Sequence, residues 1–360
     1  MRLSVLILLI GFATMSFPNG IHFQKIGQWE FDRLLHKDHL GSIINQDGDL
    51  IGMFSGQGVM VASKKGLFPF AQKGQGPGEI LNWINICTYQ EDGVGIIEMN
   101  RKTQVFRKTG ARYQWVQNIW REERDCVQIP RAALFLDNQW FLGGPIIRNT
   151  VDRAIEEKSW KSSRYVRILD RLGHFVKELV KINRDRVYRT YLMDYFLVFD
   201  ENNIYFVAED QLTVHIIKRN SLTYHKKIEL DHPDYYRGIP DGFYSSERRI
   251  HPDCIESRKL LARWKTEYSA ITKVLIFDGH FGIQIRTADK KLKRFALILY
   301  KSGTFRKVKE LFGNDLLLAV KSGKFYFLKG GDPAFDDEFE DFTIDIYGFT
   351  DKDDDQRRDI

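Results

Sequence analysis

One segment of the chain combines the side chains that most often recognise ligands. Residues 231–241 bring histidine, aspartate, tyrosine and arginine together with two prolines. Loops carry much of the binding function on rigid scaffolds, and tyrosine and arginine dominate binding hot spots. We therefore predict a binding site formed by His232, Asp234, Tyr235, Tyr236, Arg237 and Asp241. The alternative interpretation is that the prolines simply shape a long connection between strands.

Residues that could hold a catalytic metal are scattered, and no motif unites them. Asn85, Tyr191 and Asp194 lie near strands that we expect to be innermost in the fold, where oxygen ligands would suit calcium or another divalent cation. The sequence has no Gly-x-Ser-x-Gly elbow, no His-Glu-x-x-His helix and no paired-cysteine metal pattern. Catalytic residues and metal ligands remain unassigned, no cofactor is predicted, and a divalent cation stays an open alternative.

Acidic residues gather in two places near the C-terminal end of the sequence. The first group contains Asp332, Asp336, Asp337, Glu338, Glu340 and Asp341. It lacks the Asp-x-Asp-x-Asp-Gly spacing of a dedicated calcium loop, so we interpret it as a solvated connection rather than a calcium site. The second group lies in residues 351–360, which we predict to form a charged, disordered tail.

The cysteines do not indicate a metal or redox site. Cys87, Cys126 and Cys254 are odd in number, which leaves at least one thiol without an intramolecular partner. Their spacing matches no zinc pattern. Cys87 lies in an apolar run and is predicted to be a buried small hydrophobe, while a disulfide between Cys87 and Cys126 is the alternative.

The overall charge does not point to nucleic acid. The formal net charge is +6, but the 54 lysines and arginines are spread along the chain among 48 acidic residues. Nucleic-acid-binding proteins usually concentrate their basic residues on one face. We therefore predict a soluble surface of mixed charge and no nucleic-acid partner.

Residues 1–20 have the parts of a secretory signal peptide. Arg2 precedes the apolar run 3–12, and small and polar residues lead to Pro18-Asn19-Gly20. The apolar run is shorter than the roughly 20 residues that span a bilayer, although an uncleaved anchor is the alternative. No other segment approaches a membrane span. We predict an exported protein, periplasmic or extracellular.

A repeated pattern supplies the elements that must position any site. Each copy has a short apolar run, polar residues, a turn residue and in most copies a second apolar run, as expected for a β-hairpin. The copies occupy residues 59–68, 105–110, 168–175, 216–222, 297–305 and, in degenerate form, 344–349. A second turn precedes each copy, so each unit is a four-stranded antiparallel meander. Aromatic residues, 13% of the chain, favour such sheets.

Six meanders in one chain predict an all-β six-bladed β-propeller over residues 21–350. A blade buries both of its faces only against neighbouring blades, so the ring must close. We expect the alternating segment Phe23–Phe31 to supply the outer strand of the last blade. Insertions are expected at residues 145–164 and 232–270, and the second contains a predicted short helix near residues 253–268 that packs on the propeller.

The string Lys73-Gly74-Gln75-Gly76-Pro77-Gly78-Glu79-Ile80 resembles the Gly-x-Gly-Pro-Gly-Glu-Phe element of bacterial six-bladed propellers related to the NHL-repeat propellers. The match departs from that element only at Ile80, and later blades lack the string. The resemblance implies that this string links the outer strand of one blade to the inner strand of the next. Its structural inter-blade turn would comprise Gly74, Gly76, Pro77, Gly78 and Glu79.

These features favour an exported, monomeric and non-enzymatic propeller scaffold that binds a protein, glycan or small molecule. Propellers of the related kind serve as binding scaffolds, but some are hydrolases or lyases. The alternative function is therefore a metal-dependent hydrolase or lyase, similar to the lactonase-type propellers, with its site at the mouth of the central channel.

Overall fold

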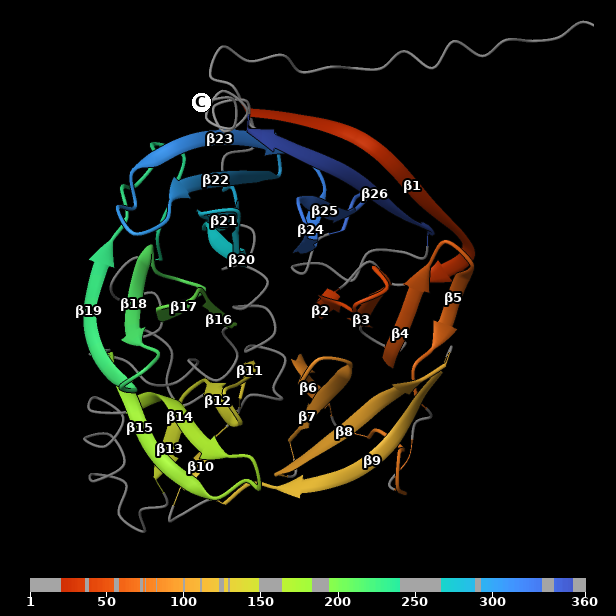
Figure 1. Ribbon diagram of the computed structural model, residues 1–360. Helices are drawn as coiled ribbons and strands as arrows, with labels where there is room; N and C mark the ends of the chain where they lie inside the picture. Colours follow the sequence, from red (N-terminus) through yellow and green to blue (C-terminus); the bar gives the residue numbers. More distant parts are fainter. Residues whose placement is uncertain are drawn as a thin grey trace, which may run out of the picture.

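The computed structural model contains six four-stranded antiparallel sheets arranged around a central axis (Figure 1). It describes residues 21–351 apart from 36–38, 55–57, 72–73, 75, 82, 100, 111, 123–125, 129, 149–163, 183–193, 240–266, 289–292 and 332–339. The six-bladed, all-β prediction is confirmed. Within each blade the strands follow one another in hydrogen-bonded order from the centre to the rim.

The first three blades are built from residues 39–181. Blade 1 contains β2 (His39–Ile44), β3 (Leu50–Phe54), β4 (Gly58–Ser63) and β5 (Gly66–Pro69). Blade 2 contains β6 (Trp83–Tyr89), β7 (Gly93–Glu98), β8 (Lys102–Thr109) and β9 (Arg112–Trp120). Blade 3 contains β11 (Ala132–Leu136), β12 (Gln139–Gly143), β14 (Arg164–Asp170) and β15 (Phe175–Lys181). A separate two-stranded sheet joins β10 (Cys126–Gln128) to β13 (Ile146–Arg148).

The last three blades use the remainder of the chain and its first described strand. Blade 4 contains β16 (Tyr195–Phe199), β17 (Asn203–Ala208), β18 (Thr213–Lys218) and β19 (Thr223–Glu229). Blade 5 contains β20 (Ala270–Phe277), β21 (His280–Arg286), β22 (Phe295–Lys301) and β23 (Lys307–Gly313). Blade 6 contains β24 (Leu316–Lys321), β25 (Lys324–Leu328), β26 (Glu340–Asp351) and β1 (Ile21–Leu35).

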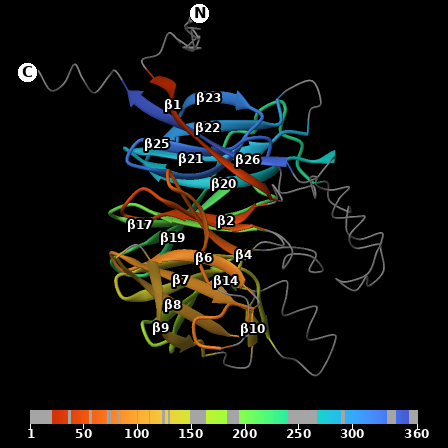
Figure 2. The ribbon, with the colours of Figure 1, turned by 90° about the vertical axis from the view of Figure 1, so that its right-hand side faces the viewer.

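The ring closes through a strand from the other end of the chain, as predicted for Phe23–Phe31. β1 pairs antiparallel with β26, from Ile21 opposite Asp351 to Leu35 opposite Glu340. Figures 1 and 2 show the two strands side by side along the outer rim. The predicted sixth hairpin at residues 344–349 was wrong: this segment lies inside the single strand β26. No turn is needed there, because β1 already supplies the outer strand.

The core lies between the blades. Each of six clusters of buried apolar side chains joins at least two neighbouring blades, and one of them joins blades 6 and 1. The predicted hairpins at the other five copies are present, and one of their turns requires glycine. Gly173, between β14 and β15, has φ +95° and leaves no room for a Cβ beside the Trp120 carbonyl.

Several predicted segments lie outside the described residues. They include the signal peptide at residues 1–20, most of the helical insertion at residues 253–268 and most of the charged tail. Among the described residues, no helix is long and apolar enough to cross a membrane.

Candidate functional site

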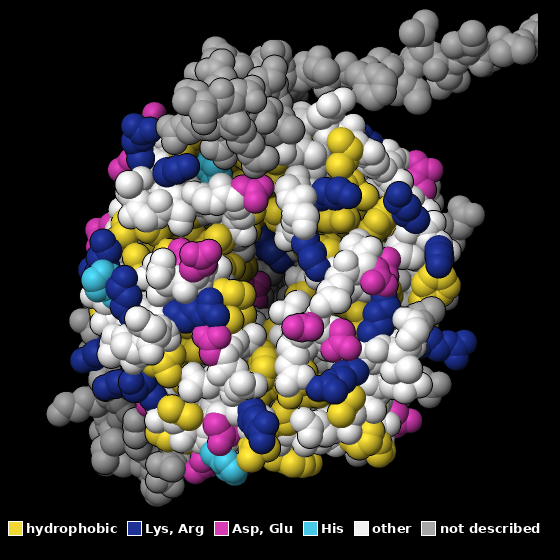
Figure 3. Space-filling model, viewed as in Figure 1, with side chains coloured by type: hydrophobic (Ala, Val, Ile, Leu, Met, Phe, Trp, Pro, Cys, Tyr) yellow, Lys and Arg dark blue, Asp and Glu magenta, His cyan; other side chains and the backbone are white. Residues whose placement is uncertain are grey.

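The six innermost strands surround a channel along the propeller axis. These strands are β2, β6, β11, β16, β20 and β24, and residues of all six line a cavity of about 360 Å³. The space-filling view shows the hollow at the centre of the disc, with basic and acidic side chains around it (Figure 3). A volume of this order is at the lower end of the range for small-molecule sites.

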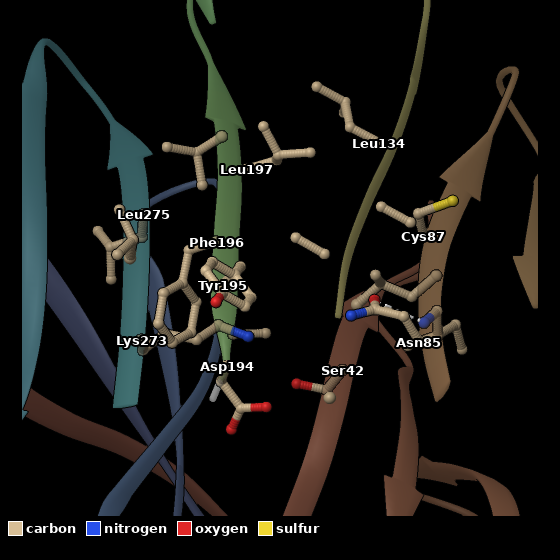
Figure 4. A pocket seen from close by; sticks show the side chains of 18 of the residues that line it. Ser42, Asn85, Cys87, Leu134, Asp194, Tyr195, Phe196, Leu197, Lys273 and Leu275 are labelled. Atoms are coloured by element: carbon tan, nitrogen blue, oxygen red, sulfur yellow. Dashed lines mark hydrogen bonds between the residues drawn. The ribbon is translucent and has the colours of Figure 1, made fainter. Parts of the chain in front are cut away.

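The channel has a polar end and an apolar end (Figure 4). Ser42, Asn85, Asp194 and Lys273 lie at the end where the inner strands begin. Leucines from three different blades, Leu134, Leu197 and Leu275, lie toward the opposite end. All inner strands run in the same direction along the axis, so residues near the start of each strand meet at one end.

Backbone contacts hold Asp194 at the polar end. Its backbone N–H donates to Glu209 Oε2 at 2.8 Å, and the backbone N–H of Glu209 donates to the Asp194 carbonyl at 3.0 Å. The Glu209 carbonyl accepts a further bond, at 2.8 Å, from the N–H of Ile271 at the start of blade 5. The carboxylate of Asp194 itself, which is half-buried, has no hydrogen bond or ion pair in the described part of the chain.

Lys273 is the second charged side chain in the channel without a partner. It is half-buried on β20, and its ammonium group makes no ion pair or hydrogen bond with any described residue. Burial without a compensating carboxylate disfavours the charged form, and it lowers the pKa of Lys273 to about 8. An ammonium group in this state is available to a ligand.

Asn85, which was also expected near the channel, makes hydrogen bonds within the protein. Its amide nitrogen donates to the carbonyl of Arg131, and its side-chain oxygen accepts from the backbone N–H of Ile86 at 2.8 Å. The structure thus brings Asn85 and Asp194 to the same end of the channel, while Tyr191 lies outside the described residues.

Sequence reasoning missed Lys273. The available signal was a lysine inside a largely apolar innermost strand, Ala270–Phe277. Among the residues that the structure describes, no group of three histidine, cysteine, aspartate or glutamate side chains is placed to hold a metal ion. Of the acidic group at residues 332–341, only Glu340 and Asp341 are described, and both lie in β26.

The predicted binding segment after β19 is attached to the propeller through its own side chains. The Tyr235 hydroxyl donates to the Glu310 carboxylate, and the Tyr236 hydroxyl donates to the Asp210 carbonyl at 3.1 Å. Burial raises the pKa of both tyrosines. The Arg237 guanidinium lies 5.0 Å from the centre of the Tyr268 ring.

Other members of this predicted set lie at the surface or outside the described residues. His232 and Asp234 are exposed, and the His232 ring packs edge-on against Tyr236 at 5.3 Å. Asp241 lies outside the described residues. The contacts that are described fasten the connection between β19 and β20 to blades 4 and 5.

The glycine-rich string lies between β5 and β6, and its glutamate closes the turn. Glu79 Oε2 accepts from the N–H of Gly76 at 2.8 Å, and the N–H of Glu79 donates to the Gly76 carbonyl at 3.0 Å. A Cβ on Gly74 would lie 2.1 Å from Glu79 Oε2. Gly78 has φ +78°, and Pro77 occupies the turn before it. The carboxylate of Glu79 therefore acts within the turn.

The cysteine alternative is corrected by the structure. Cys87 is a free, buried thiol, so it forms no disulfide with Cys126. Desolvation raises the pKa of the Cys87 thiol to about 12, which keeps it protonated and unreactive. Cys126 belongs to β10, and Cys254 lies outside the described residues.

Comparison with known proteins supports the fold and leaves the family open. No protein-family model matches the chain, and no curated protein matches it. A member of the DUF4221 family from Bacteroides vulgatus aligns with a TM-score of 0.58 and 10% identity, over 92% of this chain and 99% of that chain. A Bacteroides fragilis protein described as a candidate exported protein aligns with a TM-score of 0.56 and 13% identity, over 91% of this chain and 95% of that chain.

Proposed function

We propose that this protein is an exported, non-enzymatic and monomeric binding propeller that holds a small molecule at the polar end of its central channel. The single observation that carries the proposal is a pair of charged side chains in the channel, Lys273 and Asp194, that have no partner among the described residues. Desolvating a charge without a partner costs free energy. Such groups are typical of a site that a ligand completes.

The comparisons support the exported part of the proposal by analogy only. One protein of similar fold is described as a candidate exported protein, in agreement with the signal peptide predicted for residues 1–20. The relation to NHL-repeat propellers rests on the string Gly74–Ile80 and remains part of the proposal. A fold alone does not determine a ligand. The ligand therefore has to be inferred from the side chains that line the channel.

The test is thermal unfolding of the purified protein against a library of small metabolites, with a channel-blocking variant beside it. Leu197 lies on the channel wall, so Leu197→Trp fills the space, while the matched control Leu197→Met conserves volume. A ligand at a hundred times its Kd stabilises the folded state by about 2.7 kcal/mol. We expect a metabolite that stabilises the wild type and Leu197→Met but not Leu197→Trp.

Two outcomes would overturn this function. One is a library in which every stabilising compound acts equally on Leu197→Trp, which would place the binding elsewhere. Circular dichroism must first show that this variant is folded, and Leu197→Phe replaces it otherwise. The other is stabilisation by one divalent metal together with hydrolysis of lactones or esters, which would favour the hydrolase alternative.

A further inference from the structure

The polar end of the channel carries charges of both signs. Lys273 and Arg131 are basic, and Asp194 and Glu209 are acidic, so the charges in the cavity lining at this end balance. Glu209 is held by the backbone of Asp194, and Arg131 has interactions of its own. The two groups that have no partner in the described part of the chain are one ammonium and one carboxylate, on the neighbouring blades 5 and 4.

These two groups do not form an ion pair with each other. No ion pair within 4.0 Å joins Lys273 to Asp194, although both line the same cavity (Figure 4). A ligand placed between them must offer an anionic group to Lys273 and a cationic hydrogen-bond donor to Asp194. Charge-assisted bonds of this kind are about twice as strong as neutral ones.

The apolar end defines the rest of the ligand. Beyond the charged pair the channel continues between Leu134, Leu197 and Leu275. The cavity of about 360 Å³ is large enough for a free amino acid, because small-molecule sites begin at about 300 Å³. An apolar side chain pointing along this wall gains about 25 cal/mol for each Å² that it buries.

We infer that the ligand is a free, zwitterionic α-amino acid with an apolar side chain. Its carboxylate binds Lys273, its ammonium group binds Asp194, and its side chain lies against the three leucines. The inference rests on the proposed function, because it names the ligand class of the same channel. A simple carboxylate would place two anionic groups together at Asp194, and an uncharged sugar would leave both protein charges without a counter-charge.

The first test is calorimetric titration of the purified protein with L-leucine and three matched analogues. 4-Methylpentanoate lacks the ammonium group, 3-methylbutylamine lacks the carboxylate, and glycine lacks the apolar side chain. A hydrogen bond to a charged group is worth about 1.5–3 kcal/mol, and each 1.4 kcal/mol is about tenfold in Kd. We expect leucine to bind at least tenfold more tightly than each analogue.

The second test assigns the two charges to their protein partners. Lys273→Met should bind leucine no more tightly than the wild type binds 3-methylbutylamine. Asp194→Asn should bind leucine no more tightly than the wild type binds 4-methylpentanoate. Lys227→Met is the matched control, because Lys227 is an exposed lysine on β19, outside the channel lining, and pairs with Glu229. This control should leave the Kd for leucine unchanged.

The outcomes separate this inference from the proposed function. If another class of small molecule binds in a way that Leu197→Trp abolishes, while leucine and related amino acids do not bind, the inference is overturned and the proposed function stands. If leucine binds but Lys273→Met and Asp194→Asn leave its Kd unchanged, the inference is also overturned. If no compound depends on the channel, both fail.

Discussion

Blade 2 and the central channel both contain acidic and basic side chains that are partly or fully shielded from water. They differ in whether these side chains have hydrogen-bond or ion-pair partners. In blade 2, Glu98 is fully buried, and its Oε1 lies 3.1 Å from Lys102 Nζ and 2.7 Å from Gln104 Nε2. Arg121 donates to the Glu98 carbonyl at 2.6 Å. In the channel, Lys273 and Asp194 face a cavity and have no such partners among the described residues.

This difference separates a structural site from a functional one. The blade 2 network also reaches the glycine-rich connection, because Gln104 Nε2 donates to the Glu79 carbonyl and the N–H of Leu81 lies 3.5 Å from Glu98 Oε2. A buried charge that has partners is costly to disturb, because removing one member leaves another charge buried without compensation. A charge that lines a cavity without a partner weakens the fold, and its presence is best explained by a ligand.

The largest expected effect is a loss of stability when the blade 2 network is broken. Glu98→Ala leaves Lys102 buried without the carboxylate that it pairs with, and breaking a buried pair in this way costs about 3–5 kcal/mol. Urea denaturation should show that loss in the free energy of unfolding. Glu229→Ala removes an exposed partner of Lys227 and should cause no measurable change. Equal losses in the two variants would contradict the comparison.

A smaller effect of opposite sign, a gain in stability, is expected when Lys273 in the channel is replaced. Lys273→Met removes a desolvated ammonium group and keeps a side chain of similar length, so the ligand-free protein should become more stable at pH 7. The shift from 10.5 to about 8 is worth at most about 3.5 kcal/mol at about 1.4 kcal/mol per unit. Because solvent screens a half-buried group, we expect a gain of about 1–3 kcal/mol, measured by urea denaturation. Lys273→Arg keeps the charge and should bring no gain. Destabilisation by Lys273→Met would show that Lys273 is a structural residue.

The gain in stability from Lys273→Met should also depend on pH. Burial lowers the pKa of Lys273 from 10.5 to about 8. Between these values the unfolded chain holds a proton that the folded chain has released, so this group makes the wild type more stable as the pH rises. The gain from Lys273→Met should therefore be constant below pH 8 and shrink toward pH 10.5. Denaturation curves of the wild type and Lys273→Met at a series of pH values measure this gain in stability. A gain that does not change with pH would contradict the lowered pKa of Lys273.

Much of the fold was predictable because its signals are local. The repeated hairpins predicted six blades, which the six four-stranded sheets confirm. The alternating segment Phe23–Phe31 predicted the closure of the ring, which the pairing of β1 with β26 confirms. The error at residues 344–349 has the same origin. An apolar run with a glycine resembles a hairpin locally, although Gly348 pairs with Gln24 from the other end of the chain.

The candidate site was predicted only in part. Asp194 and Asn85 were expected near the inner strands, while Lys273 and the Glu98 network were not. Composition drew attention to the segment after β19, whose tyrosines are used to attach it to blades 4 and 5. Residue types indicate what a side chain is able to bind, but the hydrogen-bond partners that decide whether it is free are distant in sequence.

By itself, the sequence determined the number of blades, the position of five hairpins and the strand that closes the ring, because strand periodicity and turn residues act over a few neighbours. Only the tertiary structure decided which charges are satisfied. Lys273 and Asp194 are 79 residues apart in the numbering and belong to different blades. They share a cavity because six strands close around one axis, and the exposure of each group depends on that closure.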